Sequence, residues 1–215
     1  MERAAALDRV EAIVERIETD PMPVPVREVW VYGDLALGLD PVEELSVYLT
    51  KDVLLRGDDP DRASTFADEY GVEGVGRTVR AAWAEAFPEH LRANESGHVA
   101  PEKCLAAHLL PEGEPVHLEV CNTGFEDNVT GRLEGARVRG AYGEILDPRG
   151  ACLWVDGEHS PTAMEKLRAG DLVFPTLPEA LSMLGMNEGE AEEAAAVLEE
   201  HRVSREGRSV RSDVV

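Results

Sequence analysis

The sequence predicts a mixed fold of the α/β to α+β class. Segments with apolar residues at helical spacing alternate with short segments in which apolar and polar residues alternate. The chain has 215 residues and no internal repeat, which is enough for one sizeable hydrophobic core. We therefore expect a mixed sheet with flanking helices, followed by further helices toward the C-terminal end.

The N-terminal half opens with a helix. Apolar residues recur every three or four positions in residues 3–18, which predicts one buried stripe. A proline-rich connector leads to strands expected at 27–32 and 44–50. Helices are expected over about 60–71 and 77–87, because proline and glycine stand at their starts and ends.

The second half alternates in the same way. A helix is expected between Pro101 and Pro111, and a strand at 116–121, whereas the glycine-rich residues 122–140 match no clear element. A hairpin is expected to join 144–146 to 152–155 across a turn at 147–150, and three helices follow. These helices are expected at 160–170, at 178–184 behind a capping box, and at 187–201.

Side-chain direction on two of these strands suggests a site. Successive residues of a strand face opposite sides, so Glu44, Ser46 and Tyr48 share the polar face of the first strand. On the second strand, Glu119 lies on the polar face. If the two strands are neighbours, Glu44, Ser46 and Glu119 converge. The alternative is that both are ordinary strands with a half-exposed polar face.

The stretch Val29-Trp-Val-Tyr-Gly33-Asp34, followed ten residues later by Glu44-Leu-Ser46, resembles the nucleotidyltransferase superfamily. Members of that family carry Gly-Ser after the first strand and Asp-x-Asp on the second, with a third carboxylate on a later strand. The resemblance implies a nucleotidyltransferase-like mixed sheet. It also implies nucleotide binding by Gly33, Asp34 and Ser46, and candidate catalytic and Mg²⁺-binding roles for Glu44 and Glu119.

Three departures from the family pattern predict that catalysis is lost. Asp34 places a carboxylate where the family has a phosphate-binding hydroxyl, and two like charges at ~4 Å repel by roughly 4 kcal/mol. Ser46 supplies only a weak ligand for a hard cation, and Glu44 is one methylene longer than aspartate. Mg²⁺ is expected only if nucleotide binding survives. The chain is then expected to divide into a nucleotidyltransferase-like core over 1–121, an extension over 122–201 packed on it, and a disordered tail over 202–215.

The charge of the chain is typical of proteins that work in high salt, and it excludes one class of binding partner. Forty-three acidic residues oppose twenty-one basic ones, giving a formal charge of −22. Such a surface resembles proteins of halophilic archaea, and the whole chain resembles uncharacterised haloarchaeal families. It excludes a general nucleic-acid-binding surface. The exception is the tail, where an arginine recurs every third residue and could bind RNA, an acidic partner or the acidic body of the chain itself. These arginines are Arg202, Arg205, Arg208 and Arg211.

A zinc site is the rival interpretation of the same region. Cys104 and His108 share a helical face, and His117 and Cys121 share a strand face, although strand positions four apart lie ~13 Å from each other. No expected segment has the apolar length of a membrane span or of a signal peptide, so we expect a cytoplasmic protein with reduced cysteines.

From the sequence we expect a non-catalytic nucleotidyltransferase-like protein that binds a protein partner or a nucleotide. Two alternatives stay open. One is a small binding or regulatory module with no link to nucleotides, whose polar strand faces form ordinary surface. The other is a residual Mg²⁺-dependent nucleotidyltransferase. Convergence of Glu44, Ser46 and Glu119 beside Gly33 is the geometric condition that both nucleotidyltransferase interpretations require.

Overall fold

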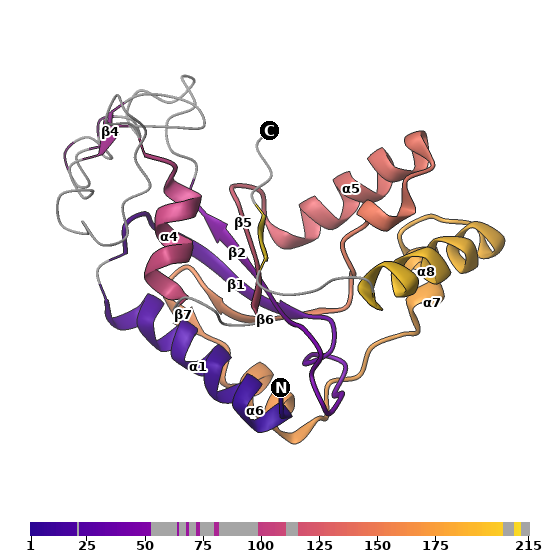
Figure 1. Ribbon diagram of the computed structural model, residues 1–215, viewed down its shortest axis with the longest axis horizontal. Coiled ribbons are helices and arrows are strands. Elements are labelled where there is room, and N and C mark those ends of the chain that lie inside the picture. The colour runs from indigo at the N-terminus through magenta and orange to yellow at the C-terminus, as the bar shows by residue number, and fades with distance from the viewer. Residues whose placement is uncertain are drawn as a thin grey trace.

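The computed structural model describes residues 1–20, 22–52, 99–110 and 116–203, together with 64, 68, 72–73, 80–81 and 209–211. Within these residues the chain forms a mixed sheet with helices on both sides (Figure 1). The predicted mixed α and β architecture is therefore confirmed.

The sheet has six strands in the order β7-β6-β1-β2-β5-β8. The strand β1 (Val26–Tyr32) pairs antiparallel with β2 (Leu45–Lys51) and with β6 (Gly150–Val155), which pairs with β7 (Glu158–His159). On its other side β2 pairs in parallel with β5 (Val116–Cys121), which pairs in parallel with β8 (Ser209–Arg211). The two strands whose polar faces suggested a site are thus direct neighbours.

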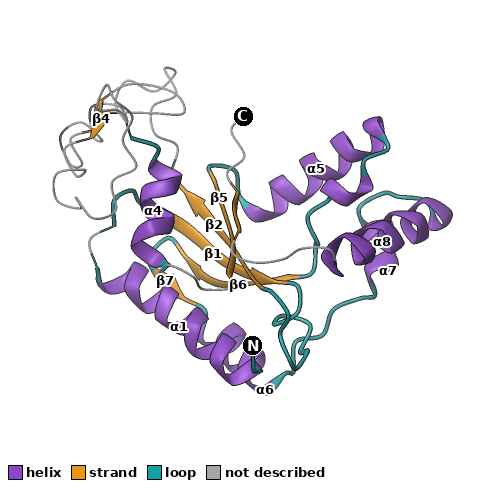
Figure 2. Cartoon of the chain, viewed as in Figure 1, coloured by secondary structure: helices purple, strands orange, loops and turns teal. Residues whose placement is uncertain are grey.

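One face of the sheet carries the main hydrophobic core. The helices α1 (Arg3–Thr19), α4 (Pro101–Leu109) and α6 (Pro161–Ala169) cover this face, as Figure 2 shows. They pack on the apolar side chains of alternate strand positions, including Val47 and Leu118. The alternation of apolar and polar residues correctly identified this face.

The opposite face carries an aromatic cluster and a separate helical layer. The helix α5 (Phe125–Arg139) places Phe125 against Trp30 at a ring separation of 4.7 Å and against Tyr48 at 5.3 Å. Beyond it, the 3₁₀ turn η2 (Tyr142–Glu144) and the helices α7 (Leu177–Met183) and α8 (Glu188–Val203) share a second core with α5. Both faces of β2 and β5 are therefore covered, and every residue of these two strands is buried.

Several helix ends follow the predicted signals. Thr176 and Glu179 form a reciprocal capping box at the start of α7. The side chain of Asn187 accepts the backbone N–H of Glu190 at 3.0 Å and so caps α8. Gly170 ends α6 with a φ of 72°, a left-handed conformation that favours glycine.

Other predictions were wrong. Residues 144–146 form no strand, and β6 instead forms a hairpin with β7. Residues 125–139, for which no element was predicted, form α5 although they contain two glycines. Arg80–Ala81 is a strand, β4, paired with β3 (Val72–Glu73), where a helix was expected. The remainder of the helices expected at 60–71 and 77–87 lies outside the described residues, apart from 64 and 68, which are helical.

The C-terminal tail also differs from the expectation. The helix α8 extends to Val203, which includes Arg202, and three residues that end at Arg211 pair with β5 where disorder was expected. The register places Arg211 opposite Glu119 along the backbone. Arg205 and Arg208 lie outside the described residues.

Candidate functional site

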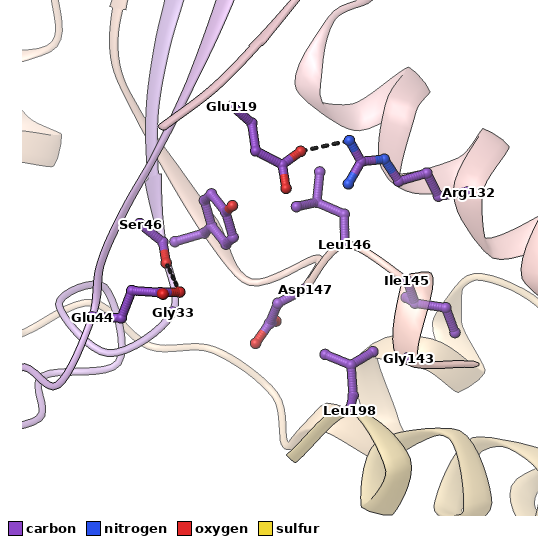
Figure 3. Close-up of a pocket in the computed structure, with 11 residues that line it drawn as sticks. Gly33, Glu44, Ser46, Glu119, Arg132, Gly143, Ile145, Leu146, Asp147 and Leu198 are labelled. Carbon is purple, nitrogen blue, oxygen red and sulfur yellow. Dashed lines mark hydrogen bonds and ion pairs between the residues drawn. The ribbon is translucent and has the colours of Figure 1, made fainter. Parts of the chain in front are cut away.

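A small cavity lies where the polar face of the sheet meets the helical layer. It is lined by residues from the end of β1, the start of β2, the middle of β5, α5, the 143–147 segment and α8 (Figure 3). Gly33, Glu44, Ser46 and Glu119 all line it, together with Arg132 and Asp147. The predicted convergence of the two strands is confirmed, and the alternative of half-exposed strand faces is wrong because both strands are buried on each side.

The turn after β1 is built by Gly33 and Asp34. Gly33 has a φ of 69°, which a residue with a Cβ rarely adopts, so glycine is favoured at this position. Asp34 is buried, and its Oδ2 accepts the backbone N–H groups of Glu43 at 3.0 Å and Glu44 at 3.3 Å. Asp34 thus ties the turn to the start of β2 and does not line the cavity.

Glu44 and Ser46 stand on the same side of the cavity. The Ser46 hydroxyl donates to Oε1 of Glu44 at 3.5 Å, a long and therefore weak hydrogen bond (Figure 3). Ser46 pairs with His117 in the parallel register of β2 and β5, two positions before the pair formed by Tyr48 and Glu119 and therefore on the same face of the sheet. This register brings the three predicted side chains to one cavity.

Glu119 is held from both sides. Its side chain is 1% exposed, Oε1 lies 3.0 Å from Nε2 of His117, and Oε2 accepts a hydrogen bond from Arg132 at 2.5 Å. Burial alone would raise the pKa of this carboxyl, but the hydrogen bonds from His117 and Arg132 and the Arg132 charge lower it to about 2. Glu119 is therefore ionised at neutral pH and neutralised by its own neighbours.

Arg132 is in turn oriented by a buried network on α5. Its Nε donates to Oδ1 of Asn128 at 3.1 Å, and Nδ2 of Asn128 donates to the Tyr48 hydroxyl at 2.7 Å. The Tyr48 hydroxyl donates to the carbonyl of Thr123 at 2.7 Å. Burial raises the pKa of Tyr48, so this phenol stays protonated and keeps its role as a donor. The network fixes α5 over β2 and β5.

Asp147 supplies a third carboxylate at the cavity. It is buried and accepts three hydrogen bonds from Arg149: from the backbone N–H at 3.0 Å, from Nε at 3.0 Å and from a terminal nitrogen at 2.8 Å. A carboxylate that accepts a bidentate guanidinium is already neutralised. Asp147 therefore organises the turn before β6.

The size and chemistry of the cavity do not fit a metal–nucleotide complex. Its volume of about 30 Å³ holds about one or two water molecules, whereas small-molecule pockets measure roughly 300–1,000 Å³. Both oxygens of Glu119 already have partners. No three His, Cys, Asp or Glu side chains in the described ranges are arranged to hold a metal ion. The residues present do not fit the Mg²⁺ that the resemblance implied for Glu44 and Glu119.

A comparison with known protein families identifies the family of this chain. A family model matches residues 2–215, which is almost the whole sequence. The chain belongs to DUF7095, a family of unknown function. No curated protein and no solved structure matches the chain. Within the part of the chain that the structure describes, none of the helices has the length and apolar character of a membrane span.

The rival zinc set is divided by the sheet. Cys104, on α4, packs in the main core on one face of the sheet, whereas Cys121 packs in the aromatic cluster on the opposite face. His117 and Cys121 share the face of β5 that carries Glu119. The four side chains therefore cannot meet at one ion.

Sequence reasoning missed the two arginines and Asp147. Arg132 lies in a segment for which no element was expected, and Asp147 was placed in the turn of a hairpin. One available signal was the pair of acidic residues at 126–127, which is typical of the first turn of a helix. The other was the Asp147-Pro148-Arg149 order, since an aspartate often accepts the N–H two residues on.

Proposed function

We propose that this protein is a non-catalytic, nucleotidyltransferase-like binding protein that acts in the cytosol of a halophile. The observation that carries the proposal is the Glu119 carboxylate, which is paired with Arg132 and His117 inside a cavity of about 30 Å³. A nucleotidyltransferase needs carboxylates that are open to divalent cations and triphosphate.

The order of elements supports the nucleotidyltransferase-like part of the proposal. The chain has a helix and then a strand that ends in a Gly-led turn. An antiparallel strand directly after Glu44 and a parallel strand with Glu119 follow, and this order is consistent with the motif. The loss of catalysis is supported by the roles of the motif residues. Asp34 holds the turn, Ser46 bonds to Glu44, and Glu119 pairs with an arginine.

The test is a thermal-shift panel in molar KCl with each nucleoside triphosphate, with and without Mg²⁺ or Mn²⁺. The salt screens the charge of −22, because the Debye length is about 3 Å at 1 M. A ligand at about 100 times its dissociation constant would stabilise the protein by roughly 2.7 kcal/mol. We expect no shift with any nucleotide. A metal-dependent shift that disappears in Glu44→Ala would overturn the proposal in favour of a nucleotide-binding enzyme.

A further inference from the structure

The strand β8 forms one margin of the sheet and comes from the segment that follows α8. It covers Ser209–Arg211 and is the short yellow strand beside β5 in Figure 1. The register pairs residues 209–211 in parallel with residues 117–119. The strand β5 runs from Val116 to Cys121, so within the described residues half of its outer edge is paired, and β8 supplies all of this pairing.

The strand β5 needs a neighbour on this edge. On its inner edge it pairs with β2 along its whole length, and every one of its residues is buried, including the polar residues His117 and Glu119. A buried strand without an outer neighbour presents a row of unpaired N–H and C=O groups, which is a template for another strand. The outer edge of β5 is therefore a strand-binding site, and β8 fills it.

Two properties of β8 suit it to exchange. A three-residue strand adds few backbone hydrogen bonds, so it opens more readily than the long strands of the sheet. It is also joined to the rest of the chain at a distance. The helix α8 ends at Val203, and residues 204–208 span at most about 20 Å before β8 begins. By contrast, a tight turn at 156–157 joins the other marginal strand, β7, directly to β6.

We propose that two copies of this protein exchange β8, so that residues 209–211 of each copy pair with β5 of the other. A second copy is the occupant that the structure supports, because every copy carries the segment that fits this edge in this register. The pairing depends on backbone hydrogen bonds, which molar salt does not screen as it screens exposed ion pairs. The inference goes beyond the proposed function, since it requires neither a nucleotide nor the sheet cavity.

The first experiment measures the mass of the full chain by light scattering in molar KCl, over an about 100-fold range of protein concentration. The dimer should increase with concentration by mass action. Val210→Pro places a residue without a backbone N–H at the centre of β8 and should weaken dimer formation at least about tenfold. The matched control is Val214→Pro, the same substitution outside β8, which should change dimer formation by less than about twofold.

The second experiment identifies the chain that supplies the strand. One copy carries ¹⁵N, and the other carries a nitroxide spin label on Asp213→Cys, a position just past β8. Both copies contain Cys152→Ser, because Cys152 is partly exposed whereas the other two cysteines are buried. The copies are unfolded and refolded together so that the strands redistribute. The amide signals of β5 in the ¹⁵N copy should then broaden, and those of β7 at the opposite margin of the sheet should not.

Several results would overturn the proposal. One is the mass of a monomer at every concentration. Another is a doubled mass that Val210→Pro leaves unchanged, because a different surface would then join the two copies. The third is an absence of broadening at β5. The spin-label experiment alters no residue of β8, so it decides the proposal even where Val210→Pro does not fold. None of these results changes the nucleotide panel, which tests the sheet cavity alone, so strand exchange and the proposed function fail separately.

Discussion

The sheet separates two acidic sites that differ in how their charges are satisfied. In the cavity on the polar face, Glu119 is 1% exposed and shares its two oxygens between His117 and Arg132. In the groove between α1 and α6, the paired side chains Glu11 and Arg168 are 32% and 53% exposed. The sheet cavity is also much smaller than the groove, with a volume of about 30 Å³ against about 370 Å³.

This difference shows why carboxylates near a family motif do not by themselves make a site. Burying a charge costs several kcal/mol unless a partner compensates for it, so an enclosed carboxylate must be paired within the fold. A carboxylate at an open groove stays hydrated and can exchange water for a ligand. The cavity is therefore a stabilising network, whereas the carboxylates of the groove stay hydrated.

The largest expected effect comes from Arg132→Met, which leaves Glu119 buried and without its main counter-charge. Removing one partner of a buried ion pair costs about 3–5 kcal/mol. Urea unfolding in molar KCl measures this loss. The matched control is Arg139→Met at the other end of α5, whose pair with Glu144 is more than half exposed and should be worth less than about 1 kcal/mol. Equal losses in the two variants would contradict the buried-network interpretation.

The next effect is a pH dependence that belongs to Glu119. Its pKa falls from an ordinary value of 4.5 to about 2 in the folded protein. The lowered pKa stabilises the fold fully above about pH 4.5, and this contribution, roughly 3 kcal/mol, is lost as the pH falls through 2. The difference in unfolding free energy between the wild type and Glu119→Gln should therefore shrink between pH 4.5 and 2. A difference that stays constant over this range would contradict the assignment.

A smaller effect is expected at the far end of the network. Tyr48→Phe removes the hydroxyl that donates to the Thr123 carbonyl and accepts from Asn128. Leaving buried polar groups without a partner costs about 1–3 kcal/mol. Urea unfolding of Tyr48→Phe measures this cost. A double-mutant cycle with Arg132→Met should show coupling, because Asn128 bonds to both side chains; strict additivity would show that the network is not one unit.

The smallest effect is expected in the groove. Arg168→Gln breaks the pair with Glu11, but both side chains are substantially exposed, so urea unfolding should show a far smaller loss of stability than in Arg132→Met. A stability loss as large as that of Arg132→Met would remove the distinction between the two sites.

The comparison also shows what the sequence could predict. Alternation placed Glu44, Ser46 and Glu119 on polar strand faces, and the parallel pairing of β2 with β5 brought them together. Alternation could not show that α5 covers this face, because burial of the polar side depends on a helix whose sequence lacks a clear apolar stripe.

The pairing of Glu119 could not be predicted for a related reason. Arg132 reaches Glu119 across thirteen residues, through a helix whose start at Phe125 is fixed by tertiary contacts. The groove was missed because its rim is an ordinary charged face of α1, and only the position of α6 gives it a second wall. Both features depend on contacts between elements that are distant in the sequence.

The central claim is that the sheet cavity does not bind a metal–nucleotide complex. Its most direct test is a Mn²⁺ titration in molar KCl, with and without ATP, in which electron paramagnetic resonance measures the free Mn²⁺. We predict that wild type, Glu44→Gln and Glu119→Gln all leave the signal of free Mn²⁺ equal to that of the protein-free control, both with and without ATP, because a cavity of about 30 Å³ is too small for a metal–nucleotide complex. A loss of free Mn²⁺ beyond that of the protein-free control with ATP, seen in the wild type and absent in Glu44→Gln, would contradict this prediction. That result would show that the cavity opens to a metal–nucleotide complex.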